Sequence, residues 1–255
     1  TADLHNHARL LLTRRTMTIR TNEGTTLTHL VFALLACLLV TATDTVRADA
    51  EDELGLWNMY FLRANLGDSR WVAQADLQLR LWEVGADTEQ IMRRGSIGYR
   101  PGGGSWILSG GFAYITARPF GDGGVDTDEN RFYQEALIPQ KVGRVALTHR
   151  IRTEQRWVDR QDFRTRYRYA LFANIPLNRE EFRPGTSYLA FYNELFINGE
   201  RDTGRGEVDY FDRNRLYAGI GYVMTDTLRL QVGVMRQDTQ NLDRTQLQLG
   251  LHHAF

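Results

Sequence analysis

The feature that most constrains the fold of this chain is an alternation of apolar and polar residues with period two, which recurs from Glu51 to Phe255. Successive side chains of a β-strand point to opposite faces, so this alternation predicts strands with one apolar and one polar face. The 3.6-residue period of a helix is nearly absent. Between residues 71 and 81 the odd positions are apolar, and the even positions from 74 onward are Gln74, Asp76, Gln78 and Arg80.

Turn-forming stretches rich in glycine, proline and aspartate separate the blocks at intervals that suit strands. The interpretation is weakest for the fifth block, whose alternation is poor and which ends in Pro139. Single-chain bacterial barrels have even numbers of antiparallel strands, so the odd number of blocks found here leads us to expect about 10 to 12 strands. The predicted strands lie near residues 54–65, 70–83, 90–100, 105–117, 131–139, 143–157, 162–176, 185–198, 210–224, 227–238 and 243–255.

We expect these strands to form an all-β, closed, antiparallel, up-and-down transmembrane β-barrel. Hydrocarbon offers no hydrogen-bond partners, so a sheet within it has to close on itself, and a tilted strand needs about 9 to 11 residues to cross. Connections that alternate between short and long are expected as well. A soluble periplasmic β-sandwich is the alternative, because its strands also alternate. The aromatic residues near block ends, which we expect in two interfacial girdles, include Trp57, Trp71, Trp82, Tyr99, Trp106, Tyr114, Trp157, Phe163, Tyr188 and Tyr222.

The segment before the alternating part has the pattern of a cleavable export signal at residues 17–50. Its apolar run, residues 30–42, has 13 residues, which suits a signal-peptide core and is too short for a membrane-spanning helix of roughly 20 residues. Arg20 precedes this run, and Ala48 and Ala50 form an A-x-A cleavage site before Glu51.

Two further expectations concern the same region. Residues 1–16 are interpreted as upstream read-through before a start at Met17, and residues 51–255 as the exported barrel. Leu34 to Cys37 partly resembles a lipoprotein signal, although an apolar stretch continues past the cysteine. Export to the outer membrane of a bacterial cell is the predicted location.

Charge and cysteine content exclude several classes of function. The chain has 31 basic and 31 acidic residues, whereas a nucleic-acid partner calls for a clustered basic excess. Cys37 is the only cysteine, so the exported part has neither a disulfide framework nor a cysteine metal site. We expect no cofactor, and the predicted partners are outer-membrane lipid and the barrel-assembly machinery.

Charged residues concentrate on one face of several predicted strands, and we interpret this face as lining the lumen. Two interpretations remain open. The arginines could attract anions, or they could pair with Glu135, Glu154, Glu194 and Asp212 as braces across a narrow barrel. The candidates for the lumen are Arg150, Arg152, Glu154, Arg156, Arg164, Arg166, Arg168, Asn193, Glu194, Arg213, Arg215 and Arg229.

No set of residues indicates catalysis or a metal site. Outer-membrane phospholipases have a His-x-Ser-Asn pattern, whereas His149 here is followed by Arg150 and Ile151. A lipid-modifying enzyme is therefore only an alternative. His252 and His253 are adjacent, so on a strand they point to opposite faces and do not share a metal ion.

The last residues of the chain resemble the C-terminal assembly signal of outer-membrane proteins, which is a terminal aromatic residue preceded by alternating apolar residues. His253 departs from that signal, which usually has an aromatic or aliphatic residue there. The residues that match it are Leu247, Leu249, Leu251 and Phe255.

Several runs in residues 51–255 resemble the family of uncharacterised outer-membrane proteins numbered as domain of unknown function 2490. The resemblance implies a Gram-negative outer-membrane barrel and carries no activity. We therefore expect a narrow channel or a structural or surface-interaction protein. The runs are ELGLWN (53–58), GSIGYR (95–100), RTEQR (152–156), RTRYR (164–168), YNELF (192–196) and DRNRLY (212–217).

Overall fold

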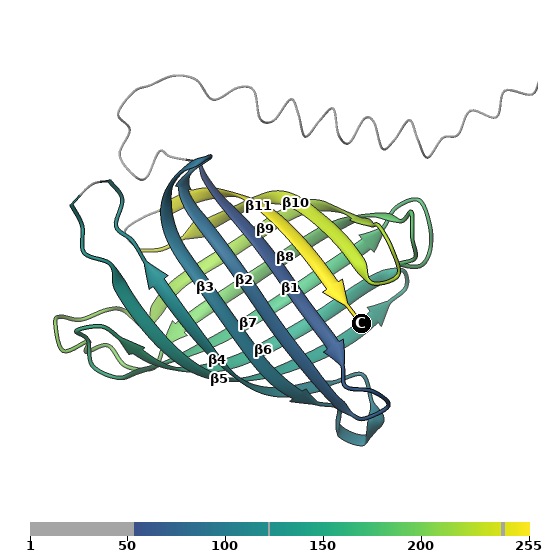
Figure 1. The fold of residues 1–255 in the computed structure, drawn as a ribbon, viewed down its shortest axis with the longest axis horizontal. Coiled ribbons are helices and arrows are strands. Elements are labelled where there is room, and N and C mark those ends of the chain that lie inside the picture. The colour runs from purple at the N-terminus through teal and green to yellow at the C-terminus, as the bar shows by residue number, and fades with distance from the viewer. Residues whose placement is uncertain (1–53, 122, 241–242) are drawn as a thin grey trace, which may run out of the picture. The chain divides into compact units, whose positions relative to one another are not determined.

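The computed structural model describes residues 54–121, 123–240 and 243–255, and in these residues eleven strands form one closed β-barrel (Figure 1). Each strand pairs with the one before it in the sequence. One short 3-10 helix, η1, spans Pro101–Gly103. The strands are β1 (Gly55–Asn65), β2 (Trp71–Glu83), β3 (Ala86–Tyr99), β4 (Ile107–Ala117), β5 (Thr127–Val142), β6 (Val145–Val158), β7 (Arg164–Pro176), β8 (Ser187–Asn198), β9 (Phe211–Val223), β10 (Leu228–Asp238) and β11 (Asp243–Ala254).

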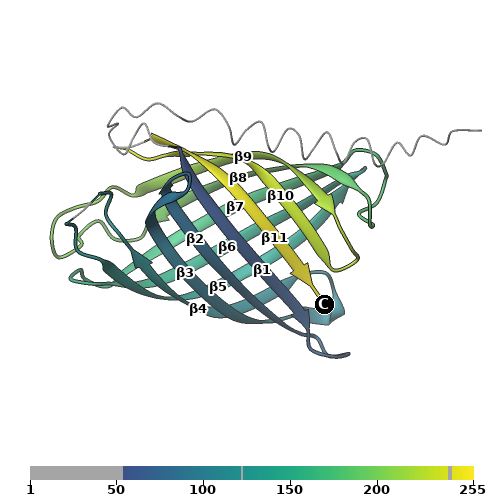
Figure 2. The same ribbon diagram turned by 45° about the horizontal axis from the view of Figure 1, so that its top comes forward.

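The barrel closes through a parallel pair. β1 pairs with β11 from Gly55 opposite Gln246 to Arg63 opposite Ala254, and Figures 1 and 2 show the two strands side by side and pointing the same way. The expectation of an antiparallel sheet throughout is therefore wrong at this one pair. In an up-and-down sheet with an odd number of strands, the first and last strands run in the same direction, so they can meet only in parallel. The even strand number was likewise a wrong expectation, although eleven strands lie within the predicted range.

The predicted strand positions hold for every element, with the largest differences in β3 and β5. β5 has 16 residues and continues past Pro139 to Val142. Its pairing with β4 has already ended at Leu137, so β5 is an edge on that side. Proline is tolerated in sheets at such edges, where its missing N–H faces no partner.

The connections do not alternate between short and long as predicted. The C-terminal rim, which carries the connections 66–70, 100–106, 143–144, 177–186 and 224–227 beside Phe255, has both kinds. The opposite rim also has both, because it carries the connections 84–85 and 199–210. The sheet closes on itself, so the sandwich alternative is wrong. No helix in the part of the chain that the structure describes is long and apolar enough to cross a membrane.

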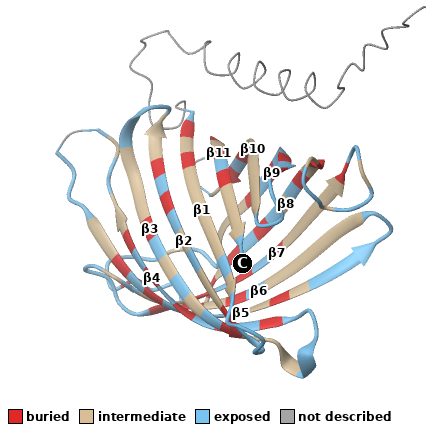
Figure 3. Ribbon diagram, turned by 45° about the vertical axis from the view of Figure 1, so that its right-hand side comes forward, coloured by how far each residue is buried: buried red, intermediate tan, exposed pale blue. Residues whose placement is uncertain are grey.

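The polar residues of this barrel lie inside it and many of the large apolar ones outside. Buried and exposed residues alternate along the strands (Figure 3). The buried residues include more polar or charged side chains than hydrophobic ones, among them Glu154 and Gln246, which are 0% exposed. On the exterior, Leu77, Phe112 and Leu216 are each 50% exposed or more. This arrangement is the reverse of an ordinary protein core.

Two of the predicted girdle aromatics lie in the interior instead. Trp57 and Tyr188 are 2% and 1% exposed, and they pack with Tyr217 and Met235 in an interior apolar cluster. Four of the others, Trp71, Trp106, Trp157 and Phe163, are about half exposed on the outer face. The alternation assigns side chains to a face only where apolar and polar residues clearly alternate. At the start of β1 they do not, because Gly55 and Trp57 precede the polar residues of the interior face.

Interior tyrosines lie over glycines of the neighbouring strand. A Cβ at Gly221 would overlap the ring of Tyr188, and a Cβ at Gly111 would overlap the ring of Tyr133. Such ring-over-glycine contacts bring the aromatic side chain flat against the sheet. The small residue is therefore required at these positions by packing.

Replacing Gly221 by alanine is expected to destabilise the barrel by about 1 to 3 kcal/mol, because the added methyl group forces the ring of Tyr188 to move. The measurement is urea unfolding in detergent micelles. Gly95→Ala is the control, since a Cβ at Gly95 would have no neighbour within 4 Å. Equal midpoints for the two variants would contradict the packing argument.

Candidate anion-binding interior

Glu154 lies at the centre of the charged interior. Its carboxylate is 2.7 Å from Arg166, 2.5 Å from Arg168, and 3.6 Å from both Arg131 and Arg152. These four arginines come from β5, β6 and β7, whose strands pair directly. The register places Arg152 opposite Arg168, and like charges that face each other across a ladder are destabilising. The shared carboxylate offsets that repulsion.

Further carboxylates extend the network on both sides of this centre. Glu194 lies 2.6 Å from Arg150 and 2.5 Å from Arg168, while Glu135 pairs with Arg152. Some of these pairs join strands that are not neighbours. Asp212 of β9 lies 2.8 Å from Arg166 of β7, so the ion pairs brace the interior across strand β8.

Several guanidinium groups lie over the faces of aromatic rings. The ring of Phe196 has Arg168 at 4.3 Å and Arg215 at 4.7 Å from its centroid. Trp57 lies in the same way under Arg80, at 3.8 Å. A cation over an aromatic face is attracted to it. The rings therefore stabilise Arg80 and Arg215, for which the described residues offer no carboxylate within ion-pair distance, as well as the ion-paired Arg168.

Eleven of the twelve lumen candidates lie on the interior face, either buried or lining its cavity. Asn193 does not, because it is adjacent to the interior Glu194 on a strand and so points to the exterior. Its amide donates a hydrogen bond to Oδ1 of Asn214 at 2.8 Å. The interior candidates are Arg150, Arg152, Glu154, Arg156, Arg164, Arg166, Arg168, Glu194, Arg213, Arg215 and Arg229.

Apart from Glu135, sequence reasoning did not include the interior charged residues of the first five strands among the site candidates. Arg94 pairs with Asp76 at 2.7 Å, and Arg131 and Arg156 both pair with Glu129. The signal for Asp76 and Arg80 was present in the alternation of β2. For Glu129 it was hidden, since the fifth predicted strand began only at residue 131, whereas β5 begins at Thr127.

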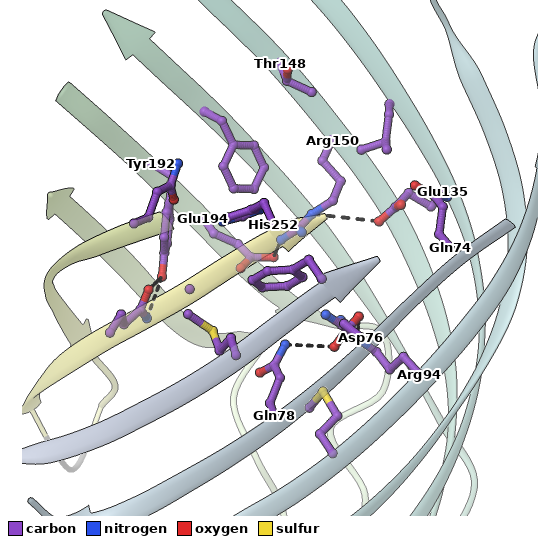
Figure 4. Close-up of a pocket in the computed structure, with 18 of the residues that line it drawn as sticks. Gln74, Asp76, Gln78, Arg94, Glu135, Thr148, Arg150, Tyr192, Glu194 and His252 are labelled. Atoms are coloured by element: carbon purple, nitrogen blue, oxygen red, sulfur yellow. Dashed lines mark hydrogen bonds and ion pairs between the residues drawn. The ribbon is translucent and has the colours of Figure 1, made fainter. Parts of the chain in front are cut away.

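A cavity of about 540 Å³ runs through the interior from the C-terminal rim. It reaches that rim because Asp226, Thr227 and Ala254 line it, and it extends inward as far as Arg80 and Arg156. In Figure 4, Arg150 lies between Glu135 and Glu194 within it. Twelve arginines and five acidic residues line the cavity, an excess of seven positive charges. Counting Glu154 and Asp212, which pair with these arginines without lining the cavity, still leaves an excess of five.

The two interpretations of the arginine face concern different residues. The bracing pairs occupy most of the arginines near Glu154 and Glu194. Among the described residues, the cavity-lining arginines that no ion pair accounts for are Arg63, Arg80, Arg215 and Arg229. These four contribute to the cavity's surplus of positive charge.

Other residues considered from the sequence lie away from this network. His149 is on the exterior, where its ring nitrogens lie 2.8 Å from the Tyr169 hydroxyl and 3.1 Å from Gln140. The described ranges contain no group of three or more His, Cys, Asp or Glu side chains that could hold a metal ion.

The two predicted targeting signals fall in different parts of the chain. Leu247, Leu249 and Leu251 share the outer face of β11, and Phe255 is 57% exposed beyond it. The export signal with its cleavage residues Ala48 and Ala50 lies outside the described residues, as do residues 1–16.

Comparison with known proteins gives one match. The family model described as "Protein of unknown function (DUF2490)" matches residues 54–248, which includes most of the barrel. No match was found among curated proteins or among solved structures.

Proposed function

The chain belongs to the DUF2490 family, whose function is unknown, and from this premise and the closed barrel we propose an outer-membrane β-barrel with a narrow interior that binds anions. The family match carries no activity, so the proposal depends on the distribution of side chains over the two faces of the sheet.

The single observation that carries the membrane proposal is the apolar exterior around a charged interior. One row on the outer face contains Leu189, Ile220, Val232 and Leu249, which oppose one another in register across β8 to β11. Exposing such side chains to water forfeits about 1.5 to 3 kcal/mol each relative to full burial. Lipid removes that cost, and a closed sheet leaves no edge that would need hydrogen bonds from hydrocarbon.

The proposal of anion binding follows from the charge of the cavity. Its surplus of arginines over carboxylates favours anionic occupants. The braces around Glu154 and Glu194 fill much of the interior with long side chains, so a wide diffusion pore does not fit this barrel.

The location and the partners belong to the same proposal. The export-signal pattern and the terminal apolar alternation support delivery by the barrel-assembly machinery and insertion into outer-membrane lipid. The enzyme alternative has less support, because His149, its only candidate base, faces outward beside Tyr169 and Gln140.

The test is a heat-modifiability gel of the protein expressed with its leader in a Gram-negative host. The protein is expected in the outer-membrane fraction, extracted only by detergent, and folded and boiled samples should migrate differently. A leaderless protein that is folded, monomeric and soluble in buffer without detergent would overturn the membrane proposal.

A further inference from the structure

We propose that the mouth of the cavity at the C-terminal rim is a binding site for a small organic anion, with a phosphonate, phosphate or carboxylate group on an aromatic body. The inference rests on the proposed function, because it names the class of ligand that the charged interior would take. Arg63 and Arg229 supply the cationic part of the site, His252 lies beside them, and the neighbouring rings supply the apolar part.

The closure of the barrel brings these three side chains together. His252 of β11 opposes Phe61 of β1 on one side and Arg229 of β10 on the other. Directly opposed residues of an antiparallel pair have Cβ atoms about 4.5 to 5.5 Å apart. Arg63 follows Phe61 by two residues on the same face of β1, and all of these side chains line the cavity.

These two arginines have no direct counter-ion among the described residues. Arg63 and Arg229 make no ion pair of 4.0 Å or less there, unlike their neighbour Arg150, which pairs with Glu194 at 2.6 Å. The nearby Glu135 is engaged by Arg152. Asp226, the other acidic residue at this mouth, is exposed in the 224–227 turn. Guanidinium groups that line a cavity without a carboxylate partner are suited to bind phosphate or carboxylate oxygens.

Aromatic rings lie against His252 and near Arg229. Phe61 stacks on the ring of His252 with centroids 4.7 Å apart. The guanidinium of Arg229 lies 5.3 Å from the centroid of Phe182, whose ring meets that of Tyr188 edge-on at 5.2 Å. Tyr188 in turn accepts a hydrogen bond from Gln231 at 3.1 Å. Of these rings, Phe61 and Tyr188 line the cavity, so they are placed to contact a ligand beside the arginines.

The size of the cavity agrees with a small ligand. Its volume of about 540 Å³ lies within the range of about 300 to 1,000 Å³ that is usual for small-molecule sites. Such sites combine an apolar lining with a few placed polar groups. An inorganic anion would contact the arginines but not the rings.

The experiment is isothermal titration calorimetry of the folded full-length barrel in dodecyl maltoside micelles, with phenylphosphonate as the probe. Phenylphosphonate should bind more tightly than inorganic phosphate, which lacks the ring, and than benzyl alcohol, which lacks the charge. R63Q and R229Q should each weaken phenylphosphonate binding about tenfold, because each removes a charge-assisted contact. F61L should weaken phenylphosphonate binding and leave phosphate binding unchanged.

R236Q is the matched control, because Arg236 lies on the same strand as Arg229 but on the outer face, where it pairs with Asp238 and Asp243. Its affinity for phenylphosphonate should equal that of the parent. Unchanged binding by the R63Q/R229Q double variant, or phosphate binding as tight as that of phenylphosphonate, would overturn the inference. A heat-modifiability gel of each variant separates this failure from loss of the membrane barrel itself.

Discussion

Replacing Glu154 by glutamine is expected to lower the free energy of unfolding by about 3 to 5 kcal/mol, the largest effect of any single substitution considered for this barrel. The reason is the position of the carboxylate, which is 0% exposed and shared by four arginines. Glutamine keeps the shape and removes the charge, so the guanidinium groups lose their common counter-ion. Urea unfolding in detergent micelles, followed by tryptophan fluorescence, measures the change.

A second variant keeps this prediction testable if E154Q does not fold. The double variant E154Q/R131M should be more stable than E154Q, because it removes one of the four cations that share Glu154. Glu129, the other partner of Arg131, keeps its contact with Arg156 at 2.6 Å. Asp238→Asn is the control, since the pair of Asp238 with Arg236 is exposed and such pairs contribute about 1 kcal/mol or less. A double variant less stable than E154Q would contradict a shared electrostatic role.

Replacing Ile220 by arginine is expected to destabilise the barrel in lipid vesicles by about 2 to 4 kcal/mol, which is the cost of a cation on the lipid face near the middle of a membrane. Ile220 is 49% exposed and lies between Leu189 and Val232 in the outer apolar row. The measurement is the folded fraction on a gel after refolding from urea into vesicles.

The control for this substitution is Leu66→Arg. Leu66 is also exposed, at 44%, but lies in the connection 66–70 at the C-terminal rim. It should fold as well as the parent protein. If Ile220→Arg folded equally well, the outer face would be tolerant of charge as in a soluble protein, and the membrane proposal would lose its main support.

The sequence alone predicted where the strands lie and which face most side chains take. Every predicted strand has a counterpart, and the parity of Arg164, Arg166 and Arg168 placed them together on the interior face of β7. Period-two alternation is a local property, because each side chain of a strand points opposite to the one before it. Such information needs no knowledge of the neighbouring strands.

The same local rule explains the errors at Asn193 and in β5. Asn193 and Glu194 are adjacent, so only one of them can face inward, and the register of β8 with β7 selects Glu194. In β5 the alternation of Glu129, Arg131 and Tyr133 on the interior face is mixed with polar residues on the exterior, such as Asn130 and Gln134. Apolar and polar positions then no longer distinguish the two faces.

Only the tertiary structure decided how the barrel closes and which charges meet. The parallel pairing of β1 with β11 follows from eleven strands closing on themselves, and it alone brings Arg63 near His252 and Arg229. The pair of Arg166 with Asp212 spans an intervening strand. These contacts depend on strand number, stagger and curvature of the whole sheet, which are collective properties of many residues. Alternation along one strand fixes the face of a side chain, whereas its partner is set by the strands that the closed sheet places around it.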